Sequence, residues 1–147
     1  MPNTKKTEKT AKPHKLTAEE IAAICAEAAD NGKAANIIRL KLVGISDVAD
    51  YVVLCTATSE PHVNAIAERI QRSLRNDYAI RPLHLDGTPK SHWMIVDYGA
   101  VVAHVMTEET RELYQLESLW GDAPRVEAVK KLTVAAKKLR KETKAKE

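Results

Sequence analysis

The chain has 147 residues, of which 44% are hydrophobic and 29% are charged, as is typical of a soluble globular protein. This length suits one domain with tails, and the absence of phenylalanine means that aliphatic side chains must fill most of its core. No apolar run reaches the roughly 18 residues of a membrane span, and the amino terminus has no apolar signal core, so we expect no membrane association and a cytoplasmic protein.

The net charge of +3 is unevenly distributed along the chain. Residues 1–15 carry +4 and residues 125–147 carry +6, whereas residues 16–124 carry −7. We therefore expect a folded acidic domain over 16–124, a disordered basic tail before it, and a basic extension after it that is either disordered or a marginal helix. An acidic body attracts a basic protein surface, whereas basic tails attract nucleic acid.

The cysteines and histidines do not indicate a cofactor. Cys25 and Cys55 lie in apolar segments without a Cys-x-x-Cys spacing, so we expect buried reduced thiols rather than a disulfide or a metal site. The five histidines are not spaced as metal ligands, and no His-Glu-x-x-His motif occurs. The sequence therefore predicts no metal and no other cofactor.

The folded domain is predicted to begin with a helix. Thr17 and Glu20 form a capping box at its start, and Gly32 ends it. The segment 35–43 alternates apolar and polar side chains, which predicts a strand with one buried face.

A central strand and a second helix follow. The continuous apolar run 51–55 predicts a strand covered on both faces. Thr58 or Ser59 is expected to cap the next helix, with Pro61 in its first turn. A short strand is predicted over 80–85, and residues 86–89 are predicted to form a loop.

Two apolar runs around 97–100 carry the clearest hairpin signal. Gly99 can take the positive φ of a tight turn, and with Tyr98 and Gly99 as its central residues Trp93 would pair with His104. One face of this hairpin is expected to carry Trp93, Ile95, Val102, His104 and Met106. The opposite face is also apolar, so the hairpin either lies between two layers or presents one face to a partner.

The last predicted helix begins after Thr107, and Glu108 and Glu109 suit its positive amino-terminal dipole. Gly121 and Pro124 end it. Its buried side is expected to consist of Leu113, Leu116, Leu119 and Trp120. Helices separated by strands predict a single-domain α/β sandwich with a mixed sheet.

The strand–helix junction at 53–63 is the usual ligand site of an α/β protein. Thr56, Thr58 and Ser59 could hold an anion there. However, no glycine brings the backbone close to a phosphate, so structural capping is the favoured interpretation.

No catalytic set of side chains emerges elsewhere. Asp47 and Asp50 could imitate a metal-binding carboxylate pair, but without a Gly-Ser loop they are interpreted as turn and cap residues. His104 is either a packed, hydrogen-bonded core histidine or part of a contact face with Trp93. Since no nucleophile, base and orienting group occur together, we do not expect an enzyme.

Five motifs occur in a specific order. They are Asp50-Tyr51-Val52-Val53-Leu54-Cys55-Thr56-Ala57-Thr58-Ser59, His62-Val63-x-x-Ile66-Ala67, Pro82-Leu83-His84-x-x-Gly87, Trp93-x-Ile95-Val96-Asp97-Tyr98-Gly99-x-Val101-Val102-x-His104-Val105-Met106, and Glu108-Glu109-x-Arg111-x-x-Tyr114-x-Leu116-Glu117-x-Leu119-Trp120. In this order they closely resemble the ribosomal silencing factor (Iojap-like) family over about residues 16–126.

The resemblance implies an α/β/α fold of the nucleotidyltransferase type without its catalytic residues. It also implies a translation repressor that binds the large ribosomal subunit through its fourteenth protein and sterically blocks joining of the small subunit when nutrients are scarce. One departure is Pro61, where many relatives carry arginine, so a contact made by that arginine does not carry over. The basic extension lies outside the family core, and no function transfers to it.

Trp93 is the residue that we expect to anchor the partner, since a large aromatic ring with a polar N–H suits an interface hot spot. Core packing against the last helix is the alternative for Trp93. The contacts expected around it are Tyr98, His104 and Met106. The carboxylates expected to pair with basic side chains of the partner are Asp86, Asp97 and Glu108.

Two other classes of protein are the alternatives. A nucleotidyltransferase-like enzyme would bind metal and nucleotide near Asp50 and residues 56–59. A general RNA-binding protein would act through its basic tails, with the steep salt dependence of phosphate contacts. Contact of the tails with ribosomal RNA and homodimerisation of the free protein are options within the silencing hypothesis.

Overall fold

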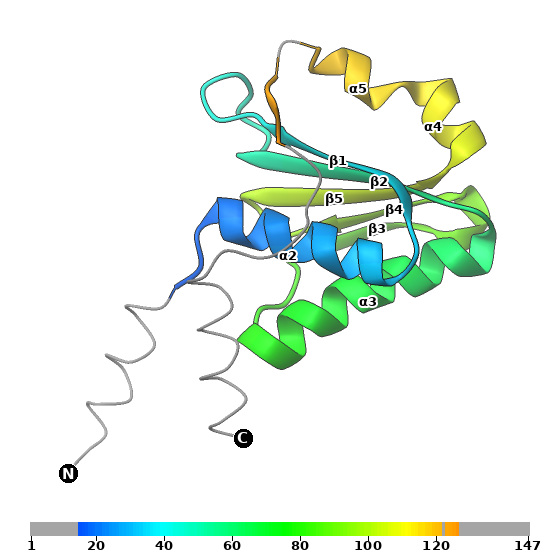
Figure 1. Cartoon of the computed structure of the whole chain (residues 1–147), viewed down its shortest axis with the longest axis horizontal. Helices are drawn as coiled ribbons and strands as arrows, with labels where there is room; N and C mark the ends of the chain where they lie inside the picture. Colours follow the sequence, from blue (N-terminus) through cyan, green and yellow to red (C-terminus); the bar gives the residue numbers. More distant parts are fainter. Residues whose placement is uncertain (1–14, 122, 127–147) are drawn as a thin grey trace.

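A six-stranded mixed sheet in the order β3-β4-β5-β2-β1-β6 forms the middle layer of the molecule (Figure 1). The structure, a computed structural model, describes residues 15–121 and 123–126. The described strands are β1 (Ala35–Lys41), β2 (Tyr51–Ala57), β3 (His84–Thr88), β4 (Trp93–Asp97), β5 (Val101–Thr107) and β6 (Arg125–Val126). The described helices are α2 (Ala18–Asn31), α3 (Glu60–Tyr78), the 3-10 helix η2 (Pro89–Ser91), α4 (Glu108–Tyr114) and α5 (Leu116–Leu119).

Helices lie on both faces of the sheet, which confirms the predicted sandwich. α2 and α3 pack on one face, and α4 and α5 lie over the other (Figure 1). β2 is parallel to β5 and antiparallel to β1, and every residue of β2 is buried, as its apolar run predicts. The larger core lies under α2 and α3, and a smaller core around Leu40, Leu54 and Met106 lies on the opposite face.

The predicted caps of α2 and α3 are confirmed, whereas Thr107, predicted to cap the last helix, is the N-cap residue of α4 but makes no side-chain capping bond. The Thr17 hydroxyl accepts a hydrogen bond from the Glu20 N–H at 3.1 Å, and the Glu20 carboxylate accepts one from the Thr17 N–H at 2.9 Å. Ser59 caps α3, because its hydroxyl accepts a hydrogen bond from the His62 N–H at 3.3 Å. The strand–helix junction therefore uses its hydroxyl for capping, as the favoured interpretation expected.

The cysteines are buried free thiols, as predicted. Burial of Cys25 in α2 and of Cys55 in β2 raises the pKa of both thiols, that of Cys55 to about 12. A thiol that is protonated at neutral pH is a poor nucleophile. Within the described ranges, no helix is both long and apolar enough to cross a membrane.

The strand predicted over 80–85 is displaced in the structure. β3 begins at His84 and continues through the segment predicted as a loop, pairing antiparallel with β4. Two features explain the error. Pro82 lacks an N–H for a ladder, and Gly87, with a φ of +81°, allows the backbone to approach Trp93 and Met94 closely.

The register of the predicted hairpin is wrong by two residues. The Tyr98 N–H donates to the Val101 carbonyl at 2.8 Å, so Gly99 and Ala100 are the central residues of the turn. Trp93 consequently pairs with Met106 rather than with His104. Because side chains alternate with a period of two, this shift leaves every side chain on its predicted face.

The single helix predicted after Thr107 is interrupted. Gln115 has a φ of +46° and separates α4 from α5. Leu113 and Leu119, predicted as buried, are 73% and 69% exposed. Leu116 and Trp120 do pack against the smaller core, and the buried side chains of α4 are Thr110 and Arg111. The interpretations of 1–14 and 127–147 lie outside the described residues.

Substitution of two glycines tests how much the close approach of β3 to β4 contributes to the free energy of unfolding. Gly44 and Gly87 have nearly equal φ values of +79° and +81°, but a Cβ at Gly44 would meet open space, whereas one at Gly87 would clash with the Trp93 carbonyl. We expect Gly44→Ala to cost about 1 kcal/mol of unfolding free energy from strain alone, and Gly87→Ala to cost about 3 kcal/mol or more. Urea unfolding measures both, and equal losses would contradict the packing argument.

Candidate partner-binding surface

Trp93 lies on β4, on the face of the sheet opposite α2 and α3. Its indole N–H donates a hydrogen bond to Nδ1 of His104 on β5 at 3.1 Å. The ring centroid of Trp93 lies 4.9 Å from that of Tyr114 at the end of α4, and 6.0 Å from that of His104. Trp93 is half-buried and packs against the smaller core, so its ring is held in one orientation from three sides.

His104 is neutral at physiological pH. Burial lowers its pKa to about 4, although the nearby Asp97 carboxylate partly opposes this shift. Since Nδ1 accepts the hydrogen bond of Trp93, the proton of the neutral ring is on Nε2. His104 therefore combines both sequence interpretations: it is largely buried and hydrogen-bonded, and it orients Trp93.

A pocket of about 350 Å³ lies between this part of the sheet and α4. It is lined by Gly87, Ser91, Trp93, Ile95, Thr110, Leu113 and Tyr114. Leu113 is 73% exposed and Tyr114 is 55% exposed at its edge. These exposed apolar side chains make this surface the candidate contact site of the domain.

Leu113 and Tyr114 are residues that sequence reasoning did not place on this surface. Leu113 fits the apolar stripe of a helix, and that stripe assigned it to the interior. The clearest available signal was Tyr114, which is part of the last motif and breaks the aliphatic pattern of that helix. We name the side chains Trp93, Ile95, His104, Leu113 and Tyr114 the aromatic surface.

The other predicted contact residues lie at different depths. Asp86 is exposed on β3 and pairs with Ile95 across the ladder, beside the aromatic surface. Asp97 lies farther along β4, and its carboxylate accepts the Gly99 N–H at 2.7 Å. Glu108 is exposed at the start of α4 but lines neighbouring pockets.

Two predicted contact residues are not part of this surface. Met106 is 0% exposed and belongs to the smaller core beneath Trp93. Tyr98 packs against the larger core on the side of α2 and α3, where burial raises the pKa of its phenol. Its hydroxyl is buried without a hydrogen-bond partner among the described atoms. Neither side chain can reach a partner that is seated on Trp93.

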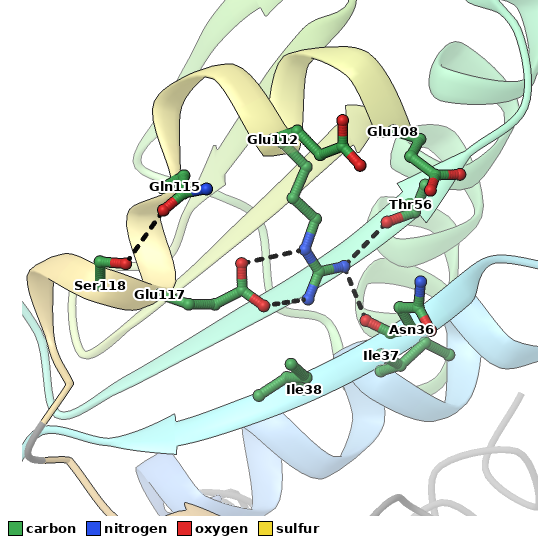
Figure 2. A pocket seen from close by; sticks show the side chains of 10 residues that line it. Asn36, Ile37, Ile38, Thr56, Glu108, Glu112, Gln115, Glu117 and Ser118 are labelled. Carbon is green, nitrogen blue, oxygen red and sulfur yellow. Dashed lines mark hydrogen bonds and ion pairs between the residues drawn. The ribbon is translucent and has the colours of Figure 1, made fainter.

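Arg111 fastens α4 to the sheet next to the aromatic surface (Figure 2). Nη1 donates to the Asn36 carbonyl at 2.7 Å and to the Thr56 hydroxyl at 2.8 Å. Nε and Nη2 donate to the two carboxylate oxygens of Glu117 at 3.3 and 2.9 Å. This hydrogen bonding lowers the pKa of Glu117, although partial burial opposes the shift.

Carboxylates surround the carboxyl ends of the parallel strands, where an enzyme of this fold class would hold a ligand. A pocket of about 440 Å³ there is lined in part by Glu60, His92, Glu108 and Glu109, and Glu60 pairs with His92 at 2.9 Å. Such a lining repels phosphate groups. In the described part of the chain, no three His, Cys, Asp or Glu side chains are grouped to hold a metal ion.

An α/β/α scaffold that displays fixed aromatic and aliphatic side chains beside carboxylates defines a class of protein that recognises another macromolecule. Residues 15–147 match the family model described as "Ribosomal silencing factor during starvation". The chain belongs to this ribosomal silencing factor family.

Individual relatives agree with this assignment. The chain is 36% identical over 112 residues to the ribosomal silencing factor RsfS of Halalkalibacterium halodurans, covering 76% of this chain and 95% of that protein. It is 34% identical over 76 residues to the mouse protein named mitochondrial assembly of ribosomal large subunit protein 1, covering 48% of this chain and 32% of that protein. A crystal structure of a Chromobacterium violaceum protein, 29% identical, superposes with a TM-score of 0.69 over 72% of this chain and 88% of that chain.

The neutral state of His104 predicts a pH-dependent stability. An unfolded histidine has a pKa of about 6.5, so between this value and the folded pKa of about 4 the unfolded state binds more protons. The free energy of unfolding should therefore fall as the pH drops from about 6.5 to about 4, and His104→Gln should lack this part of the dependence. NMR titration of the imidazole gives the folded pKa directly, and a midpoint near 6.5 would contradict the structure.

Proposed function

We propose that the protein represses translation by binding the large ribosomal subunit through its fourteenth protein and by sterically blocking the small subunit. Membership of the ribosomal silencing factor family supports this role, and the name of the mouse relative refers to the large subunit. The observation that carries the proposal is the aromatic surface, in which the exposed Leu113 and Tyr114 flank a half-buried Trp93 that is held in place by a hydrogen bond and ring contacts. Repression under nutrient limitation follows from the family resemblance.

Trp93 serves as the anchor of this interaction. Its hydrogen bond to His104 and its contact with Tyr114 fix the ring before a partner arrives. A side chain that is already ordered loses little conformational entropy on binding, so more of its contact energy contributes to affinity. Aromatic residues in such settings are the usual hot spots of protein interfaces.

The charge of the domain favours a basic partner. Residues 16–124 carry a net charge of −7, and Asp86 and Glu109 are exposed on β3 and α4. Ribosomal proteins are basic, so this field attracts them and speeds encounter. The basic tails in turn are suited to contact ribosomal RNA near the binding site, where they would add a salt-dependent term to the affinity.

The first test replaces the anchor. Trp93→Ala should weaken cosedimentation with purified large subunits at least tenfold, since hot-spot aromatics contribute about 2 kcal/mol or more to binding. Small subunits should then join in the presence of the variant at a concentration at which the wild type blocks joining. The far-UV circular dichroism spectrum should match that of the wild type. Undiminished subunit joining in the presence of saturating wild-type protein would refute the proposal.

A matched pair of leucines distinguishes specific binding through the aromatic surface from non-specific apolar contact. Leu113 and Leu119 are similarly exposed, at 73% and 69%, but only Leu113 lines the pocket beside Trp93. Leu113→Ala should weaken binding about fivefold to tenfold, because about 1 kcal/mol or more of apolar contact is lost, whereas Leu119→Ala should have little effect. Equal effects of the two substitutions in the same sedimentation assay would place the interface elsewhere.

A further inference from the structure

We propose that Arg111 and Glu117 are positioning residues that hold Tyr114 against Trp93 and so keep the aromatic surface formed before the partner binds. This inference rests on the proposed function, because it concerns the same surface. It assigns a role to a buried ion pair that does not itself face the partner. Arg111 is 7% exposed, and its guanidinium lies under α4, between that helix and strands β1 and β2 (Figure 2).

Apart from the contacts of Arg111, α4 itself has few features that stabilise its position. It has seven residues, its N-cap residue Thr107 makes no side-chain capping bond, and isolated helices of this length are unstable in water. Its apolar residues Leu113 and Tyr114 are exposed, so burial of apolar area cannot fix its last turn. Thr110 and Arg111 are the buried residues of α4, and Arg111 makes its polar contacts to the sheet, while Leu116 of α5 packs against the smaller core on the other side of Tyr114.

The guanidinium is held from two sides. On the sheet side it donates to the Asn36 carbonyl and to the Thr56 hydroxyl. The Asn36 carbonyl is available because β1 has an irregular register there and Asn36 has a φ of +49°, a conformation that asparagine tolerates. On the other side Arg111 donates to both carboxylate oxygens of Glu117, the two-pronged geometry that gives the strongest and most directional ion pairs.

The turn at Gln115 makes the contact between Arg111 and Glu117 possible. In a continuous α-helix, residues six positions apart point about 120° away from each other around the axis and lie about 9 Å apart along it, so Glu117 could not make this paired contact with Arg111. The left-handed conformation of Gln115 ends α4 after Tyr114 and redirects the chain into α5. Glu117 then closes on Arg111 and fixes the last turn of α4 from its carboxyl-terminal side.

Tyr114 follows Arg111 by three residues, so the two lie on adjacent parts of the helix surface. With Arg111 fixed to the sheet, the Tyr114 ring stays 4.9 Å from the Trp93 ring. Without Glu117, Arg111 keeps its hydrogen bonds to the sheet but loses its link to α5, so the turn that carries Tyr114 is held less firmly. Binding would then have to order Tyr114 first, which weakens affinity without removing any group that touches the partner.

The test is a double-mutant cycle on binding to purified large subunits with the full-length chain. We expect Tyr114→Ala to weaken binding about tenfold and Glu117→Ala about fivefold, while the double variant should be no weaker than Tyr114→Ala alone. The matched control is Glu112→Ala, which removes an exposed carboxylate from α4 that also lines the pocket beside Arg111. It should change affinity less than Glu117→Ala does.

A spectroscopic readout tests the positioning without the ribosome. The indole N–H signal of Trp93 in a nitrogen–proton NMR spectrum should shift in Glu117→Ala, because the Tyr114 ring moves, and should stay in place in Glu112→Ala. If Glu117→Ala fails to fold, Glu117→Gln keeps one acceptor for Arg111 and should give a smaller shift and a smaller loss of affinity.

The outcomes distinguish this inference from the proposed function. Losses that multiply in the double variant, or an unmoved Trp93 signal in Glu117→Ala, would overturn the positioning role even if Trp93→Ala abolishes binding. Full binding by both Trp93→Ala and Tyr114→Ala would overturn the proposed function, and with it the purpose of the positioning. A shifted Trp93 signal would then still establish the contact between α4 and the tryptophan.

Discussion

The burial of one guanidinium constrains much of the face that carries Trp93. An arginine that is removed from water must have its donors satisfied, because an unpaired buried charge costs several kcal/mol. Arg111 meets this requirement with a carbonyl from the irregular start of β1, a hydroxyl from the central strand and a carboxylate from α5. Two strands that are distant in the sequence, and the helix that directly follows, are thereby joined to one short helix. Because the charged group of Arg111 occupies the buried side of α4, the apolar side chains of Leu113 and Tyr114 at the end of that helix are exposed.

The hairpin of β4 and β5 supplies the other half of the aromatic surface. Both of its faces are apolar, and the structure uses them differently. One face packs under α2 and α3, where Val96, Ala103 and Val105 are fully buried. The other is only partly covered, because α4 and α5 are too short to extend across β4. Trp93 and His104 lie where the helices leave this face uncovered. The hydrogen bond between them pairs the indole N–H of Trp93 with Nδ1 of His104, which would otherwise be half-buried without a partner.

The sequence predicts those parts of this arrangement that depend on local chemistry. Capping at Thr17 and Ser59, the fully apolar β2 and the two faces of the hairpin follow from side-chain type and spacing. The position of β3 does not, because its residues are all exposed and its extent is set by pairing with β4. The break at Gln115 is equally hidden, since glutamine is a good helix former and the Arg111–Glu117 ion pair that spans the left-handed turn forms only in the folded protein. The exposure of Leu113 and Tyr114 follows from that break, so the part of the surface on α4 could not be predicted from periodicity.

The carboxyl ends of the parallel strands are not arranged to bind a phosphate. In α/β proteins this edge binds phosphates through free backbone N–H groups at a helix start. Here the Thr58 N–H donates to Nδ1 of His62, and the backbone N–H of His62 donates to the Ser59 hydroxyl. Nε2 of His62 donates to the Gly32 carbonyl at 2.8 Å. The donors at this edge are therefore used to join α3 to the end of α2, and the neighbouring glutamates oppose an anion. Closing the edge in this way makes the scaffold more rigid, and a rigid sheet is what a surface needs if it acts by occupying the place of another macromolecule.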